Sequence, residues 1–377
     1  MSNIKAYAWY FPNWHPNEMN DRWHGKGWTE WECVKCARPR FEGHLQPKVP
    51  LWGYEDESDP KVFEKKIATA KKYGIDGFIF DFYWYKDGPY RRDCLDKGFL
   101  GAANNTDAEF SVMWCNHNPV YIHPALYMHD DVQLLDGSVD DKLFFEVTQY
   151  CIDNYFEKEN YQKVDGKAFF GIWNLATLIE NFGGAENLAQ RFADFRNRAK
   201  ANGIELHIST NREQIPGYWE KDKALCDETI DILGIDSAFS YSWPHIYTEG
   251  WPKVEYADIR ERYFEILDQE TEFIKIPLST TVSTGWDSSP RTVQSEMYDD
   301  VGYPYMPIQV GNTPQEVGKA FEQVKKFIDS DKHTGKFFTI TTWNEWTEGN
   351  YLEPDELYGY GYLEEFNKAF RGGVLND

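Results

Sequence analysis

One complete helix-and-strand unit is encoded in residues 59–82, which read DPKVFEKKIATAKKYGIDGFIFDF. Asp59 is a good helix N-cap, and the proline after it suits the first helical turn. Three apolar residues fall on one face of the predicted helix: Phe63, Ile67 and Ala70. Gly74 stands where a left-handed C-cap is expected, and the apolar strand Gly77–Phe82 follows. The stretch therefore predicts an amphipathic helix that leads into a buried strand.

The same alternation runs along the whole chain. Seven other short apolar segments have the character of strands that are covered on both faces: Ile4–Tyr10, Phe110–Cys115, Ala168–Trp173, Ile204–Thr210, Ile232–Asp236, Ile274–Thr280 and Phe337–Thr342. Helical patterns lie between them, at Leu143–Tyr155, Ala185–Asn202, Glu255–Glu272 and Pro314–Ile328. Eight alternating strands predict a parallel sheet. We expect it to close as a (β/α)8 TIM barrel.

An open doubly wound sheet is the competing fold. It should carry a glycine-rich phosphate loop after an early strand, whereas the first strand here ends Trp-Tyr-Phe-Pro at residues 9–12. We therefore favour a single barrel domain over residues 1–377, although the length alone would also permit two domains. The first connection, from Phe11 to about Ser58, is long and rich in tryptophan, so we expect an ordered loop over the barrel mouth.

Composition restricts the partners. The formal net charge is -23, which argues against nucleic acid and anionic membranes and fits a neutral or cationic small partner, or simply solubility. Aromatic residues make up 17% of the chain. Tryptophan and tyrosine join an apolar face to a polar edge, as the sugar-binding clefts of proteins require. An oligosaccharide or polysaccharide partner is therefore favoured, and the sequence says nothing of the oligomeric state.

Other features point away from metal, cofactor and membrane. The six cysteines include one close pair, Cys33 and Cys36, without the second pair that a zinc site needs. Asp329-Ser330-Asp331 resembles a metal-binding motif of sugar transferases, but its place at a predicted helix end is typical of solvated charge. We expect no cofactor. No signal-peptide pattern and no apolar run of about 20 residues is visible, which indicates a cytoplasmic protein without membrane insertion.

Active sites of such barrels lie at the carboxyl ends of the strands. The strand ends here carry many polar and aromatic side chains, which we take as candidate substrate-binding residues: Tyr10, His15, Asp81, Tyr83, Trp114, Asn116, His117, Trp173, Asn211, Tyr241, Trp286, Trp343 and Asn344. The long first loop adds Trp28. For Asp81 an internal salt bridge is an equal alternative, and Asn116 and His117 could instead cap a loop.

Two carboxylates end the eighth strand, in Trp343-Asn344-Glu345-Trp346-Thr347-Glu348-Gly349. On a continuous strand Glu345 and Glu348 would face opposite ways, but a turn at Trp346, which Gly349 favours, would bring both to one cavity. Glycoside cleavage commonly needs two carboxyl groups, one of them protonated. Contact with tryptophan rings would raise a carboxyl pKa as a general acid requires. Structural packing is the alternative, and we favour catalysis.

Three segments resemble a known family: YFPNWH at residues 10–15, then GKGWTEWE at 25–32 with PRFEGHLQP at 39–47 and AKKYGIDGF at 70–78, and finally WNEWTEGN at 343–350, which ends in LEP at 352–354. Together they are similar to the WbsX-type family, whose members are often labelled glycosyltransferases of polysaccharide gene clusters. That family resembles the family 99 glycoside hydrolases, endo-α-mannosidases with β/α barrels.

The resemblance implies roles for the glutamate pair. Carried over, Glu348 is the general acid/base, and Glu345 assists attack by the 2-hydroxyl of the sugar, which gives a retaining hydrolase for α-linked, manno-configured or similar glycans. One segment departs from the family: Trp114-Cys115-Asn116-His117 has histidine where glutamate is usual. The alternatives are a glycosyltransferase in surface polysaccharide biosynthesis and a non-catalytic carbohydrate-binding barrel.

Overall fold

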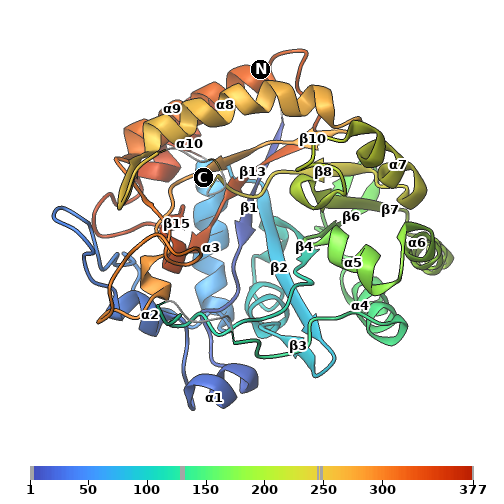
Figure 1. Cartoon of the computed structure of the whole chain (residues 1–377), viewed down its shortest axis with the longest axis horizontal. Helices are drawn as coiled ribbons and strands as arrows, with labels where there is room; N and C mark the ends of the chain where they lie inside the picture. Colours follow the sequence, from blue (N-terminus) through green and yellow to red (C-terminus); the bar gives the residue numbers. More distant parts are fainter. Residues whose placement is uncertain (1–3, 128–131, 244–245, 247–248, 376–377) are drawn as a thin grey trace.

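The computed structural model describes residues 4–127, 132–243, 246 and 249–375. Its central sheet is a parallel barrel, formed in order by β1 (Lys5–Tyr10), β2 (Gly77–Tyr85), β4 (Glu109–Trp114), β6 (Lys167–Ile172), β7 (Leu206–Asn211), β8 (Ser237–Phe239), the pair β10 (Leu278–Ser279) and β11 (Thr281–Ser283), and β13 (Phe337–Thr341). β10 pairs with β8, and β11 pairs with β13. β13 pairs with β1. The seventh strand, interrupted at Thr280, thus connects the two sides of the barrel (Figure 1).

Helices cover the barrel on the outside (Figure 1). They are α3 (Pro60–Tyr73), α4 (Asp141–Asn154), α5 (Leu175–Asn181), α6 (Ala185–Ala201), α7 (Lys223–Leu233), α8 (Tyr256–Phe273), α9 (Pro314–Ile328) and α10 (Gly361–Arg371). The predicted caps are present: the Asp59 side chain accepts from the Lys61 amide, and Gly74 is left-handed with φ 87°. Thr313 caps α9 in the same way, by accepting from the Glu316 amide.

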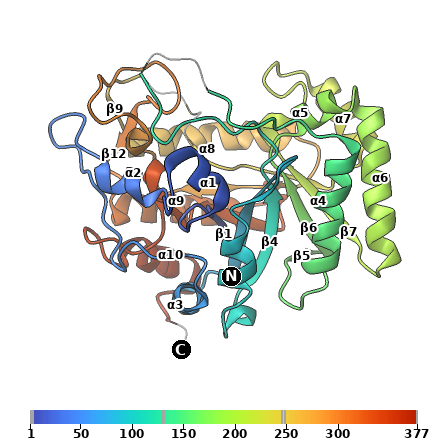
Figure 2. The ribbon, with the colours of Figure 1, turned by 90° about the horizontal axis from the view of Figure 1, so that it is seen from below.

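The long first connection folds into two short helices, α1 (Glu18–His24) and α2 (Trp31–Cys36). Figure 2 shows both beyond the carboxyl end of β1, on the side away from the N-terminus. Four short strand pairs extend the loops: β3 (Gly88–Tyr90) on β2, β5 (Lys163–Val164) on β6, β9 (Lys253–Glu255) with β12 (Ile308–Val310), and β14 (Asn344–Glu345) with β15 (Asn350–Tyr351). The expected loop over the barrel mouth is therefore ordered.

The sixth strand lies further along the chain than predicted. Ile232 belongs to α7, whose buried residues Cys226, Thr229, Ile230 and Leu233 follow the helical period. Gly234 ends the helix in a left-handed conformation with φ 61°. β8 begins only at Ser237, so Asp236 lies at the amino end of the strand, where Arg196 pairs with it at 2.9 Å. Asp236 is therefore remote from the barrel mouth.

Two hydrophobic clusters reflect the alternation of side chains along the strands. Tyr7 and Trp9 of β1 point into the barrel, where they join Ile79 and Met113. The neighbours of these residues on each strand point outward and pack under the helices, where they form the larger cluster. In the described part of the chain, no helix is both long and apolar enough to cross a bilayer.

Candidate active site

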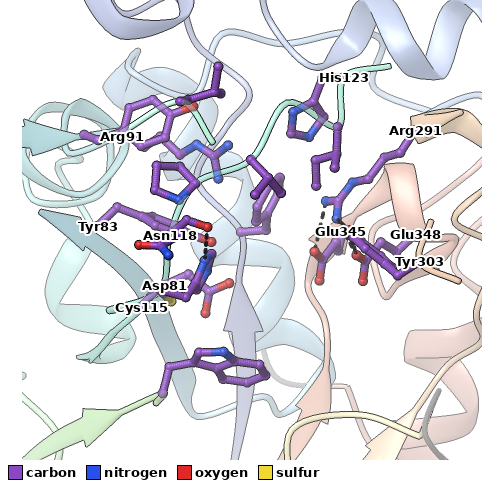
Figure 3. A pocket seen from close by; sticks show the side chains of 18 of the residues that line it. Asp81, Tyr83, Arg91, Cys115, Asn118, His123, Arg291, Tyr303, Glu345 and Glu348 are labelled. Atoms are coloured by element: carbon purple, nitrogen blue, oxygen red, sulfur yellow. Dashed lines mark hydrogen bonds and ion pairs between the residues drawn. The ribbon is translucent and has the colours of Figure 1, made fainter. Parts of the chain in front are cut away.

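A cavity of about 370 Å³ opens at the carboxyl ends of the strands. Residues from at least six barrel strands or the loops after them line it, among them Asp81, Met113, Trp173, Tyr241, Trp286 and Glu345. Phe11, Trp23 and His24 of the first long loop complete one wall. Figure 3 shows Glu345 and Glu348 on one side of this cavity, with Arg91, Tyr83 and Asp81 on the other.

The glutamate pair is brought together by a tight turn after β13. Glu345 ends β14, and a 3-10 turn, Trp346–Glu348, follows at once. Gly349 closes the turn with φ 60°, and a Cβ there would lie 2.8 Å from the Cβ of Asp287. Both conformation and space therefore require glycine at this position. The predicted turn thus places both carboxyl groups in one cavity.

Arg291 holds the two carboxylates in place. Its guanidinium pairs with Glu345 at 3.1 Å and donates a short hydrogen bond to Glu348. The Nε of the same side chain pairs with Glu30 at 3.1 Å. Tyr303 donates to Glu348 at 2.8 Å. One cation therefore lies among three buried carboxylates, and its fork geometry suits this bridging role.

The three carboxyl groups differ in their affinity for protons. Burial and the charge of Glu348 raise the pKa of Glu345 well above its ordinary value, and Arg291 opposes this only in part. Burial also raises the pKa of Glu348, against the effects of Arg291 and Tyr303, and Glu348 accepts a hydrogen bond from the Glu345 carboxyl. For Glu30, His123 and Arg291 outweigh burial and hold the pKa well below its usual range. The surroundings of Glu345 and Glu348 therefore favour protonation of the pair, whereas those of Glu30 favour its ionised form.

Asp81 is a third carboxyl group in the cavity. Tyr241 connects it to the pair, because the Tyr241 hydroxyl lies 3.1 Å from Oδ2 of Asp81 and 3.3 Å from Oε2 of Glu345. Burial raises the pKa of Asp81 to about 8, although the Tyr241 hydrogen bond and Arg91 work against the shift. Its Oδ1 is buried and has no hydrogen-bond partner among the described residues. Asp81 is therefore largely protonated at neutral pH and can donate to a ligand.

The protonation of Asp81 predicts a pH-dependent stability. The folded chain keeps a proton on Asp81 up to about pH 8, whereas the unfolded chain loses it near 3.8. This contribution to stability is full below the lower value and is lost as pH rises through the upper one. Relative to Asp81→Asn, the wild-type free energy of unfolding should therefore fall by several kcal/mol between these pH values. Urea denaturation across this range measures the difference, and parallel curves for both proteins would contradict the assignment.

Six of the predicted binding residues line the cavity: Asp81, Tyr83, His117, Trp173, Tyr241 and Trp286. Trp173 contacts Tyr241 with ring centroids 4.7 Å apart, so the two form a continuous aromatic wall. Trp28 lies beside the rim rather than in it. It stacks on His24, a residue that lines the cavity, at 3.9 Å.

The structure places three predicted aromatic residues in the core instead of the cavity. Tyr10 packs on Phe63 and Phe80, Trp114 on Phe144, and Trp343 on Phe78. The reason is the period of two along a strand: Trp9 and Met113 point inward, so the next residues point to the helices.

The remaining polar candidates serve the loops. Asn116 exchanges hydrogen bonds with the backbone of Asn174 at 2.8 and 2.9 Å. The Asn211 side chain caps the turn at Glu213, and Asn344 bonds both backbone groups of Phe11. His15 is buried, and burial lowers its pKa to about 4. None of these four lines the cavity among the described residues.

Several residues of the cavity and its surroundings were not predicted from the sequence. Arg91 and Arg291 stand in the loops after β3 and β11. Arg291 bonds Glu30, which lies 261 positions away in the sequence. His24 and His123 line the cavity, and Glu30 lies behind it in contact with Arg291. Glu30 belongs to the segment at residues 25–32, which resembles the WbsX-type family. That resemblance is the one sequence signal that could have assigned Glu30 to the site.

Within the described residues, no group of three histidine, cysteine, aspartate or glutamate side chains is arranged to hold a metal ion. The carboxylates of the cavity are instead bonded to Arg291, Tyr303 and Tyr241. The six cysteines are all free thiols, and five of them are buried. The cavity therefore offers acid, base and stacking groups from the chain itself.

The fold and the cavity define a (β/α)8 barrel with a glutamate pair at its mouth. The chain belongs to the Glycosyltransferase WbsX family, whose model matches residues 6–366. It is 26% identical over 373 residues to "Uncharacterized protein WxcX" of Xanthomonas campestris pv. campestris (strain B100), which covers 96% of this chain and 49% of that protein. The chain thus spans about half the length of this curated relative.

Solved structures share the fold. The GH99 endo-alpha-mannosidase from Bacteroides thetaiotaomicron superimposes with a TM-score of 0.58 and 15% identity, over 98% of both chains. A "Glycoside hydrolase-like protein" gives a TM-score of 0.60 with 16% identity, over 97% of this chain and 94% of the other. At these identities the similarity shows the TIM-barrel fold.

Proposed function

We propose that the chain is a retaining glycoside hydrolase that acts on an α-linked, manno-configured or similar glycan. The observation that carries the proposal is the buried Glu345–Glu348 pair, which lines a cavity with aromatic walls at the mouth of the barrel and whose pKa values are raised by burial. With one proton on the pair, one carboxyl group can act as an acid while the other acts as a base. The similarity to hydrolase barrels supports the same reaction class.

The proposed nucleophile is the substrate's own 2-hydroxyl, as the resemblance to the family 99 hydrolases implies. This reaction differs from direct attack of a carboxylate on C1, and it uses both carboxyl groups of the pair that Arg291 bonds. In the proposed first step, the proton of the pair passes from Glu345 to Glu348, and Glu348 gives it to the glycosidic oxygen as the C1–O bond breaks. Glu345, now a carboxylate, takes the proton of the 2-hydroxyl as O2 bonds to C1. Water then attacks C1 and opens this three-membered ring. The attacking water gives one proton to Glu348, and Glu345 returns to O2 the proton that it took from the 2-hydroxyl.

A transferase is the second candidate, favoured by the name of the family. If the donor is a glycan, the first step of the transfer reaction is the same as in hydrolysis. In the second step, a hydroxyl group of the acceptor sugar attacks C1 in place of water. A transferase that uses a nucleotide sugar instead needs a donor with a diphosphate. A non-catalytic barrel would bind a glycan and release no product.

A panel of aryl α- and β-glycosides and α-mannan oligosaccharides tests these functions. We expect wild-type protein to release sugar from one α-linked member without a nucleotide sugar, with the same rate in EDTA. On the oligosaccharide members, whose leaving groups need protonation, Glu348→Gln should be slower by about 10²- to 10⁴-fold. The surface variant Glu356→Gln should behave as wild type, since Glu356 is exposed. Product formation only after nucleotide sugars are added would favour the transferase, and binding without any product would favour the non-catalytic barrel.

A further inference from the structure

Arg91 differs from the other buried arginines of the described chain. Four arginines are at most 8% exposed: Arg91, Arg212, Arg260 and Arg291. The last three form ion pairs with glutamates: Arg212 with Glu270, Arg260 with Glu316, and Arg291 with Glu345. Within the described residues, Arg91 has no carboxylate at ion-pair distance, and its Nε has no hydrogen-bond partner. Among the buried arginines of the described chain, Arg91 is therefore the one without a carboxylate in direct contact.

The local structure aims this cation at the cavity. Arg91 follows the β2–β3 hairpin and has a left-handed backbone with φ 59°. Its guanidinium lies 4.4 Å from the ring of Tyr90, 4.8 Å from that of Tyr83 and 4.9 Å from that of Phe11. Figure 3 shows the guanidinium pointing into the pocket, opposite Glu345 and Glu348. The rings fix the guanidinium at the wall of the cavity, where Arg91 is one of the lining residues.

Aromatic contacts alone do not account for a cation in this place. Cation–π contacts offset only part of the cost of burying an ion that has no directly bonded anionic partner. A planar guanidinium donates two parallel hydrogen bonds to a carboxylate, sulfate or phosphate. An oxyanion on a bound ligand would therefore supply the directly bonded anionic partner that Arg91 lacks among the described residues.

The other groups on this side of the cavity leave room for an anion. Burial lowers the pKa of His117 and of His123, and it lowers the pKa of His24 to about 4, so these rings are neutral at neutral pH. Asp81 is protonated there, because burial raises its pKa to about 8. Glu30 is the ionised carboxylate that acts on Arg91 from behind the cavity, and it also pairs with Arg291 at 3.1 Å. No described carboxylate is thus in direct contact with Arg91, although the whole chain has a net charge of -23.

We infer that the glycan carries an anionic substituent, a hexuronate carboxylate or a sulfate ester, which binds Arg91 beside the glutamate pair. Phe11 supports the placement, since Arg91 and Arg291 lie against this one ring at 4.9 and 5.3 Å. The anion would then lie on the sugar at the cleavage site or on its neighbour. The inference rests on the proposed function for the identity of the ligand as a glycan, but it concerns binding and does not require turnover.

Binding to oligosaccharides in matched pairs tests this inference. Each pair contains a hexuronate or sulfated oligosaccharide and its neutral counterpart, the carboxyl-reduced or desulfated sugar, and isothermal titration measures both. We expect wild-type protein to bind at least one acidic member about 10-fold or more tightly than its neutral partner. Arg91→Met should remove that preference and leave the affinity for the neutral sugar unchanged, whereas Arg91→Lys should keep part of it.

Arg92→Met is the matched control. It removes the same charge one position away, but Arg92 pairs with Asp96 at 2.7 Å and does not line the cavity. It should keep the acidic preference. Wild-type preference for neutral members, or binding of no acidic member, would overturn the inference even if hydrolysis were established. Tighter Arg91-dependent binding of guanosine diphosphate than of every acidic sugar would overturn it too, in favour of a nucleotide donor.

Discussion

Glu348→Gln is expected to lower kcat for an unactivated glycosidic bond by about 10²- to 10⁴-fold, because general acid catalysis contributes that much. The substitution keeps the shape of the side chain and its contact with Tyr303, which lies 2.8 Å from Glu348. Substrate binding should therefore persist. The reaction to be measured is hydrolysis of the oligosaccharide that the glycoside panel identifies, with kcat and KM determined separately.

The leaving group distinguishes the two glutamates. Fluoride needs little protonation to depart, so in the first turnover Glu348→Gln should release fluoride from the corresponding glycosyl fluoride at close to the wild-type rate. Later turnovers remain slower, because Glu348 also takes a proton from water in the second step. Glu345→Gln should lose activity on both substrates, because the attack of the 2-hydroxyl needs its base in either case. If Glu348→Gln were equally slow with the fluoride, or Glu345→Gln were rescued by it, the two roles would have to be exchanged.

The barrel could be predicted from local patterns because its strands and helices are encoded locally. Helix caps such as Asp59 and Gly74 and apolar faces such as that of α9 are properties of neighbouring residues. The sixth strand was misplaced because its core is only Ser237–Phe239, while the more apolar run before it belongs to α7. A strand of three residues gives a weaker hydrophobic pattern than the apolar end of the helix that precedes it.

The cavity could be predicted only in part, because composition does not say which way a side chain points. Asp81 and Tyr83 were expected at the mouth and line it, whereas Tyr10 and Trp114 point outward from equally apolar strands. One residue of shift exchanges the two faces of a strand. If Trp9 and Met113 are known to point inward, the alternation along each strand assigns Asp81 and Tyr83 to the cavity and Tyr10 and Trp114 to the outer face.

The arginines of the site were beyond the reach of local patterns. Arg291 meets Glu30, which is 261 positions away, and Glu345, which is 54 positions away. Arg91 enters the cavity through a hairpin, β2–β3, that extends past the expected end of the strand. Both depend on how loops converge over the barrel, and that convergence is a property of the whole fold.

Arg291→Met is expected to destabilise the protein by about 3–5 kcal/mol at pH 8, the usual cost of removing one partner from a buried ion pair. Three buried carboxylates, those of Glu30, Glu345 and Glu348, lose their shared cation. Arg291 lowers the pKa of each, so its removal shifts all three folded-state values upward. A folded state with raised carboxyl pKa values binds more protons than the unfolded chain, and its stability falls as pH rises.

The deficit of Arg291→Met should therefore be smaller near pH 4, where Glu345 and Glu348 bind protons in the folded state and Glu30 alone keeps its charge, and should grow towards pH 8. Guanidinium chloride denaturation of both proteins over this range measures it. Arg291→Lys, which keeps the charge but not the planar fork, should lie between them. A deficit of equal size at every pH would mean that Arg291 acts by packing against Phe11, which its guanidinium approaches at 5.3 Å, and not as the counter-ion of the glutamate pair.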